Sequence, residues 1–342
     1  MIKIMKRGEV SESELFARKV SGADVAGTVA EIIADVRENG DAALRKYNEK
    51  FDKCTCESLE VSEEEFAAAM AAVPAEYLRV LERSAGNIRE YHLRQVRHDY
   101  IVTAEDGSVL GQRVLPMARV GLYVPGGTAA YPSSVLMNCI PAKIAGVGEI
   151  VMTTPASGGE VSPAILAAAK VAGVDRVFKV GGAQAVAALA YGTESVPRVD
   201  KIVGPGNAFV AEAKRQVYGQ VAIDMIAGPS EILIVSDGKT NAKWLAADML
   251  SQAEHDKLAT AILITDSAAL AGEVAEEIER QLAALPREEI ARASIENNGK
   301  IIVAGDLEDA VAIANEIAPE HLELCVDAPF DYLGKVKNAG SI

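Results

Sequence analysis

Residues 118–155 read ARVGLYVPGGTAAYPSSVLMNCIPAKIAGVGEIVMTTP, and this stretch decides the fold. An apolar strand pattern, ARVGLYV, ends in the glycine turn PGG, and a helical pattern, VLMNCIPAKIAGV, leads to a second apolar strand, EIVMTTP. Buried strands separated by helices of about 10–15 residues are typical of βαβ units. The stretch therefore predicts a parallel sheet covered by helices.

The alternation of strand and helix patterns continues along the chain, and a second series begins near residue 230. The segments SPAILAAAKVAGV, AQAVAALAYG and NAFVAEAKRQVYG are helical in pattern, and the strand patterns RVFKVGG and KIVGPG alternate with them. After AGPS a second series runs from the strand EILIVSD to the strand LELCVD. The two series share no sequence period, which favours two Rossmann-like α/β domains with mainly parallel sheets over a solenoid.

The first third of the chain has a different pattern, without alternating strands and helices. Residues 1–22 look like a polar N-terminal arm, and from residue 23 to about residue 96 apolar residues recur at helical spacing. Helices of this kind need a sheet to cover, and we assign them to the second series. The sequence thus predicts a discontinuous α/β domain over 23–120 and 231–342, into which a second α/β domain over 121–230 is inserted.

Composition limits the classes of partner. The chain of 342 residues has 34 Lys plus Arg against 49 Asp plus Glu, a net charge of −15, which disfavours nucleic acid. No apolar leader is visible, and no run approaches the ~20 apolar residues of a membrane span. The four cysteines do not form a disulfide framework, so we expect a cytoplasmic protein.

Glycine-rich turns follow several predicted strands. They are Pro125-Gly126-Gly127, Gly181-Gly182, Gly204-Pro205-Gly206 and Ala227-Gly228-Pro229-Ser230. In open α/β sheets ligands bind outside the carboxyl ends of strands, where glycine lets the backbone approach closely. Ordinary strand–helix turns also use glycine, and the G-x-G-x-x-G fingerprint of dinucleotide binding is absent. Four such turns in one region favour a ligand-binding rim.

Two polar motifs accompany the second series. Gln252 and His255 in SQAEHD are three residues apart at a predicted helix end, so both project from one face; they are candidate metal ligands or a plain polar helix end. Glu320 and His321 in APEH follow Pro319 at a helix-to-strand junction. A carboxylate beside an imidazole can divide proton-transfer work, although both side chains could equally be solvated.

Together, five motifs in family order make the chain resemble the histidinol dehydrogenase family. They are GLYVPGG (121–127), GPGNAFVAEAKRQV (204–217), AGPSE (227–231), SQAEHD (251–256) and APEHLEL (318–324). The resemblance implies a four-electron oxidation of L-histidinol to L-histidine through bound histidinal, the last step of histidine biosynthesis. It also implies two NAD per turnover, one zinc per subunit and a homodimer.

The resemblance assigns roles residue by residue. It implies that Tyr123, Gln184 and Asn207 contact NAD, which makes 121–230 the NAD-binding domain. It implies that Glu320 and His321 are catalytic. The implied substrate contacts are Ser230, Gln252, His255 and His321, and the implied zinc ligands are Gln252 and His255.

One departure from the family pattern bears on activity. The family takes two further zinc ligands, an Asp and a His, from a C-terminal tail, and the sequence stops at KNAGSI without one. The resemblance then implies half a zinc site and an inactive or weakly metallated form of 342 residues. Two alternatives stay open: a dehydrogenase of the same fold acting on another polar alcohol, and an inactive truncated chain that still folds.

Overall fold

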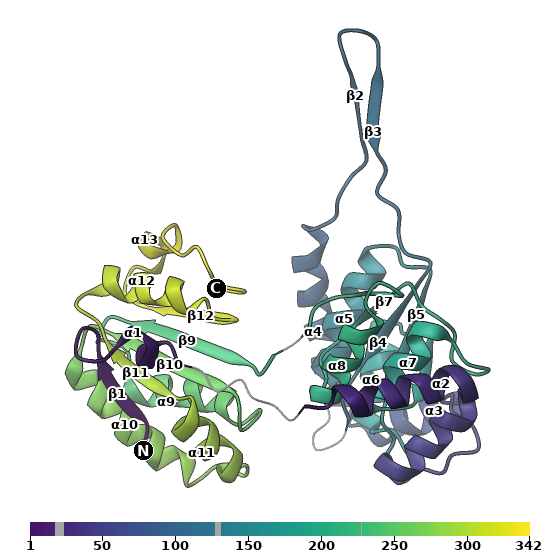
Figure 1. Ribbon diagram of the computed structural model, residues 1–342, viewed down its shortest axis with the longest axis horizontal. Helices are drawn as coiled ribbons and strands as arrows, with labels where there is room; N and C mark the ends of the chain where they lie inside the picture. Colours follow the sequence, from purple (N-terminus) through teal and green to yellow (C-terminus); the bar gives the residue numbers. More distant parts are fainter. Residues whose placement is uncertain (18–23, 127–130, 227) are drawn as a thin grey trace. The chain divides into compact units, whose positions relative to one another are not determined.

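Two five-stranded parallel sheets organise the chain, one in each of two compact units. The computed structural model describes residues 1–17, 24–126, 131–226 and 228–342. Unit 1 comprises Met1–Gly22 with Gly228–Ile342, and unit 2 comprises Ala23–Ala227 (Figure 1). One unit is thus inserted in the other, as the sequence predicted, but the inserted unit begins near residue 23 rather than at 121.

The sheet of unit 2 carries the stretch that decided the fold. Its strands are β4 (Arg119–Tyr123), β5 (Glu149–Thr154), β6 (Arg176–Lys179), β7 (Lys201–Val203) and β8 (Ala222–Ile223). Their spatial order is β6-β5-β4-β7-β8, and all neighbours are parallel. The connecting helices are α5 (Pro132–Ile144), α6 (Pro163–Ala172), α7 (Gly182–Tyr191) and α8 (Ala208–Val217). Because the strands are parallel, all their carboxyl ends lie at one edge of the sheet.

The N-terminal helices cover this sheet, not the later one, and the predicted partner was wrong. They are α2 (Ala26–Tyr47), the π-helical turn η1 (Asn48–Asp52), α3 (Glu63–Ala72) and α4 (Ala75–Leu93). Helix α2 packs on α7 and α8, α3 packs on α6, and α4 packs on α5 and α6. The helical pattern itself is confirmed, and α3 begins with a capping box formed by Ser62 and Glu65.

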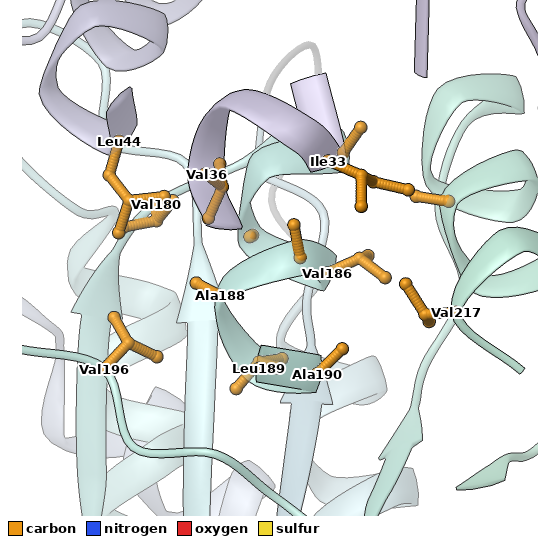
Figure 2. Close-up of a cluster of buried hydrophobic side chains, with 14 of the residues drawn as sticks. Ile33, Val36, Leu44, Val180, Val186, Ala188, Leu189, Ala190, Val196 and Val217 are labelled. Carbon is orange, nitrogen blue, oxygen red and sulfur yellow. The ribbon is translucent and has the colours of Figure 1, made fainter. Parts of the chain in front are cut away.

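The reason lies in the composition of α7. Eight of its ten residues, Ala183 through Ala190, are buried, so the helix has no polar face to turn toward water. The strands cover one side of α7, and the apolar face of α2 covers the other through Ile33, Val36 and Leu44 (Figure 2). Burying each such α2 side chain contributes about 1.5–3 kcal/mol, which stabilises the packing of α2 on α7.

Unit 1 repeats the architecture with a strand from the N-terminus. Its strands are β1 (Lys3–Lys6), β9 (Glu231–Ser236), β10 (Thr260–Thr265), β11 (Lys300–Val303) and β12 (His321–Cys325), in the spatial order β1-β11-β10-β9-β12. Its helices are α1 (Glu12–Leu15), α9 (Ala242–Ala253), α10 (Ala268–Leu282), α11 (Glu288–Asn297), α12 (Leu307–Ile317) and α13 (Pro329–Leu333). All strand pairs are parallel.

The predicted polar arm is therefore partly a strand, and that prediction was wrong. β1 pairs with β11, and Ile2 and Met5 are buried in the core of unit 1. A four-residue strand that begins and ends with lysine is too short for periodicity to reveal. The strand forms because β11 offers an open sheet edge with unpaired backbone groups.

A two-stranded hairpin interrupts unit 2 between α4 and β4. Strands β2 (Tyr100–Thr103) and β3 (Val109–Gln112) are antiparallel. Figure 1 shows the hairpin extending away from the helices and sheet of its own unit. Its apolar side chains, Ile101 and Leu110 among them, are exposed at 75% and 70%. An apolar surface of this kind in a polar protein commonly marks an interface.

Candidate active site

Three glycine turns meet at the carboxyl edge of the unit 2 sheet. Gly126 follows β4, Gly181 and Gly182 follow β6, and Gly204 follows β7. A methyl group on Gly181 would lie 2.6 Å from Cβ of Pro155, and one on Gly204 would overlap the carbonyl oxygen of Tyr123. The backbones therefore approach each other more closely than any other residue allows. Gly127 and Ala227 lie outside the described residues.

Tyr123 and Gln184 meet at the Gly182 turn. The backbone N–H of Gly182 donates to the hydroxyl of Tyr123 at 3.1 Å, so the tyrosine O–H remains able to donate. Burial raises the pKa of Tyr123 to about 12, which keeps the hydroxyl protonated. The side chain of Gln184 is 1% exposed, and neither of its polar atoms has a hydrogen-bond partner among the described residues. Two polar groups with unused capacity thus face one turn.

Asn207 fixes the end of the third turn. Its side-chain oxygen accepts from the N–H groups of Phe209 and Val210, which caps the N-terminus of α8. The residue itself is exposed at this rim. Capping accounts for an asparagine at this position even without a ligand.

A buried ion pair holds the same loop. Lys214 is 2% exposed, pairs with Asp224, and donates to the carbonyl of Gly204 at 3.0 Å. Asp224 in turn accepts from the N–H of Gly204 at 2.7 Å. The peptide groups on both sides of Gly204 are therefore fixed by charged partners, and the rim is rigid at this turn.

Glu320 and His321 stand at the start of β12 in unit 1. Nδ1 of His321 lies 2.7 Å from Oγ of Ser341, and its Nε2 lies 3.8 Å from Oε1 of Glu320. The other carboxylate oxygen of Glu320 accepts from the N–H of Glu231 at 3.2 Å, and the N–H of Glu320 donates to the carboxylate of Glu231 at 3.3 Å. Both side chains are about half exposed, at 44% and 49%, so they are held in place yet accessible.

The other predicted residues of unit 1 lie at the same edge as this pair. Ser230 directly precedes β9, and its carbonyl accepts from the N–H of Thr260 at the start of β10. Helix α9 runs back from the carboxyl end of β9, which brings Gln252 and His255 to the amino ends of the strands. The turn at Gly228 thus belongs to unit 1 and to an amino edge, not to the glycine rim of unit 2 as predicted.

One detail of the predicted metal motif needs correction. Helix α9 ends at Ala253, so His255 lies just beyond it and not on the same helical face as Gln252. The N–H of His255 donates to the carbonyl of Gln252 at 3.2 Å, which keeps the two residues close along the turn. Among the residues that the structure describes, no group of three or more His, Cys, Asp or Glu side chains is placed to hold a metal.

Several residues of this region were not predicted from the sequence. Glu323 lies near His321, and Asp248 lies near Glu323: burial and the charge of Asp248 raise the pKa of Glu323, and burial raises the pKa of Asp248. Alternation along β12 places Glu323 on the same face as His321, so the strand pattern could have revealed it. Ser341 approaches through a pairing between distant segments, for which no local signal exists.

A glycine rim on the parallel sheet of unit 2, and an imidazole–carboxylate pair on that of unit 1, are features found in α/β enzymes. Comparison with family models narrows the class, because the histidinol dehydrogenase model matches residues 16–342. The chain belongs to the histidinol dehydrogenase family and is an oxidoreductase.

Individual relatives agree with this assignment. The chain is 58% identical over 317 residues to histidinol dehydrogenase of Syntrophotalea carbinolica, covering 92% of this chain and 74% of the relative. It is 54% identical over 325 residues to that of Geobacter sulfurreducens, covering 94% and 76%. The crystal structure of histidinol dehydrogenase from Elizabethkingia anophelis superposes with a TM-score of 0.95 at 37% identity, covering 99% of this chain and 79% of that one.

Proposed function

We propose that the protein oxidises L-histidinol to L-histidine through bound histidinal, with two NAD in succession as hydride acceptors. Histidinol oxidation in histidine biosynthesis follows from the family; the cofactor is our extension. The observation that supports NAD binding is the buried side chain of Gln184. A buried amide without a hydrogen-bond partner costs about 1–3 kcal/mol, and such a group is retained where a ligand forms the missing hydrogen bonds. Tyr123 and Asn207 would add contacts at the same rim. The glycine turns leave the backbone approachable there.

Gln184→Met tests this role through opposite effects on binding and stability. Methionine fills a similar volume without an unsatisfied polar group, so we expect an unchanged or higher melting temperature together with a loss of NAD affinity of roughly tenfold or more. Gln216→Met is the matched control: Gln216 donates to the carbonyl of Ala26, so its loss should lower stability and leave NAD affinity intact. Titration calorimetry and thermal unfolding measure both; unchanged NAD affinity in Gln184→Met would contradict the proposal.

The contacts of unit 1 support specific proton-transfer roles. The hydroxyl of Ser341 lies 3.5 Å from the carbonyl of Glu320, to which it can donate. It then accepts from Nδ1–H of His321, which leaves Nε2 with a free lone pair. His321 would accept the alcohol proton at Nε2. NAD, for which Tyr123, Gln184 and Asn207 are the proposed contacts, would supply the hydride acceptor. Glu320 would take a proton from the water that attacks the aldehyde, and His321 would assist the second oxidation.

The reaction stoichiometry tests the activity as a whole. The protein supplied with histidinol, NAD and zinc should release two NADH for each histidine formed, because one carbon loses four electrons. One NADH per substrate, or none, would contradict the proposal. A substrate panel separates the alternative: a tenfold preference for an alcohol without an imidazole would favour a different dehydrogenase of this fold.

Zinc is proposed as the metal that positions the substrate, with Gln252 and His255 as two of its ligands. An amide oxygen and an imidazole nitrogen are acceptable zinc donors, but a zinc site normally needs four. The described residues do not complete such a site, so we assign no catalytic step to the metal. The chain of 342 residues is therefore expected to lose zinc on dialysis. Stoichiometric zinc by mass spectrometry after dialysis would show that these residues suffice.

A homodimer is also proposed, in line with the family. The exposed apolar side chains of the β2–β3 hairpin support it, since they would be covered by a second copy. Sedimentation velocity of the purified protein measures this directly.

We further propose that the enzyme acts in the cytoplasm; all four cysteines are free thiols, as a reducing compartment requires. In the part of the chain that the structure describes, no helix has the length and apolar character to span a membrane.

A further inference from the structure

A carboxylate from the N-terminal helices reaches the glycine rim of unit 2. Asp52 is the last residue of η1, far from the rim in sequence. A methyl group on Gly181 would lie 3.2 Å from Oδ2 of Asp52, which places the carboxylate directly beside the Gly181–Gly182 turn. The packing of α2 on α7 brings the two segments together.

The environment of Asp52 leaves its charge uncompensated. The side chain is partly buried, and burial raises the pKa of its carboxyl group. No hydrogen bond to this carboxylate exists within the described residues, in contrast to Asp35, which accepts from Lys46, Asn39 and Tyr47. A carboxylate removed from water without a partner is costly, so a ligand that donates to it would be stabilising.

The polar groups at this turn are complementary to a sugar diol. Asp52 can only accept hydrogen bonds when ionised, the hydroxyl of Tyr123 can donate, and the buried amide of Gln184 can do both. Burial is the main cause of the raised pKa of Tyr123, and the charge of Asp52 adds to it, as expected for groups on either side of this turn. At neutral pH a phosphate group has hydrogen-bond acceptors but no donors. A carboxylate at this position would therefore repel a phosphate.

We propose that Asp52 determines the preference for NAD over NADP, by accepting hydrogen bonds from the adenosine ribose hydroxyls and excluding a 2′-phosphate. This inference rests on the proposed binding of NAD. Dinucleotide-binding folds usually place such an acidic residue about 20 residues after the glycine turn. Here the sequence lacks that fingerprint, and the tertiary fold supplies the carboxylate from a helix that precedes the sheet.

Asp52→Asn tests the assignment with titrations of NAD and NADP into the intact chain. The amide has nearly the same shape but no charge. We expect NAD affinity to fall roughly tenfold and NADP affinity to stay level or rise, so that the preference drops by roughly tenfold or more. Glu49→Gln is the matched control, because it removes one charge from an exposed position on the same η1 turn. It should leave both affinities unchanged.

The outcomes separate this inference from the proposed function. If the unmodified protein binds NAD and Asp52→Asn keeps the same preference within twofold, the role of Asp52 is wrong and NAD binding stands. If the unmodified protein binds neither dinucleotide, both fall. Should Asp52→Asn fail to fold, Asp52→Glu decides the question: it retains the charge and must still exclude NADP, and NADP binding by this variant would overturn the proposal.

Discussion

Replacement of His321 by asparagine is expected to lower kcat for histidinol oxidation by roughly 10²- to 10⁴-fold, the usual contribution of a positioned general base. Asparagine keeps a polar group of moderate size but cannot take a proton near neutral pH. His321 is 49% exposed, so the melting temperature should change little. Steady-state rates of NADH formation by the zinc-supplied protein measure the effect.

His92→Asn is the control for the loss of an imidazole. Nδ1 of His92 also lies 2.7 Å from a side-chain oxygen, that of Gln95, but the residue belongs to α4 and has no proposed role. Its replacement should leave kcat within about twofold, the change expected of an exposed position. A His321→Asn enzyme that retained more than a tenth of the normal kcat would remove His321 from the proton-transfer steps.

Gly204→Ala is expected to cause the largest loss of stability in unit 2. Gly204 has φ of +116°, and an added methyl group would overlap the carbonyl oxygen of Tyr123. The loop cannot move aside easily, because Lys214 and Asp224 hold both neighbouring peptide groups. We expect the free energy of unfolding to fall by about 3 kcal/mol or more, with loss of NAD binding.

Gly219→Ala separates the two causes of this loss. Gly219 also has a positive φ, +99°, but an added methyl group would meet open space. Its replacement should cost only the conformational strain, about 1–2 kcal/mol. Chemical denaturation of both variants measures the difference. Equal losses would show that the close approach to Tyr123 contributes nothing, and that the rim is less rigid than the geometry indicates.

The regular alternation of strands and helices made both sheets predictable from sequence. The packing partner of α2 was harder to predict, because an apolar helical face fits any apolar surface. The sequence signal that could have identified this partner is the missing polar face of α7. β1 could not be found locally, since its pattern is four residues long and its partner β11 is almost at the other end of the chain.

The residues of the candidate site likewise fall into those that local sequence patterns predicted and those that they did not. Residues beside a recognisable local signal lie where that signal placed them: Gln184 follows a predicted glycine turn, and His321 stands at a predicted strand start. Residues that act through tertiary contacts did not stand out: Ser341 approaches His321 by a distant pairing, and Asp52 reaches Gly181 only because α2 packs on α7. Their sequence neighbourhoods carry no sign of the site, and only the packing of separate segments reveals them.

The pairing of β1 with β11 has a consequence for how the chain is made on the ribosome. The first strand leaves the ribosomal tunnel early, yet its partner, Lys300–Val303, is translated only near the end of these 342 residues. Unit 2 has all its strands long before then and can fold while synthesis continues. During that interval β1 has no β11 to pair with, and Ile2 and Met5 are accessible to chaperones. Slower translation of the last third would lengthen this wait.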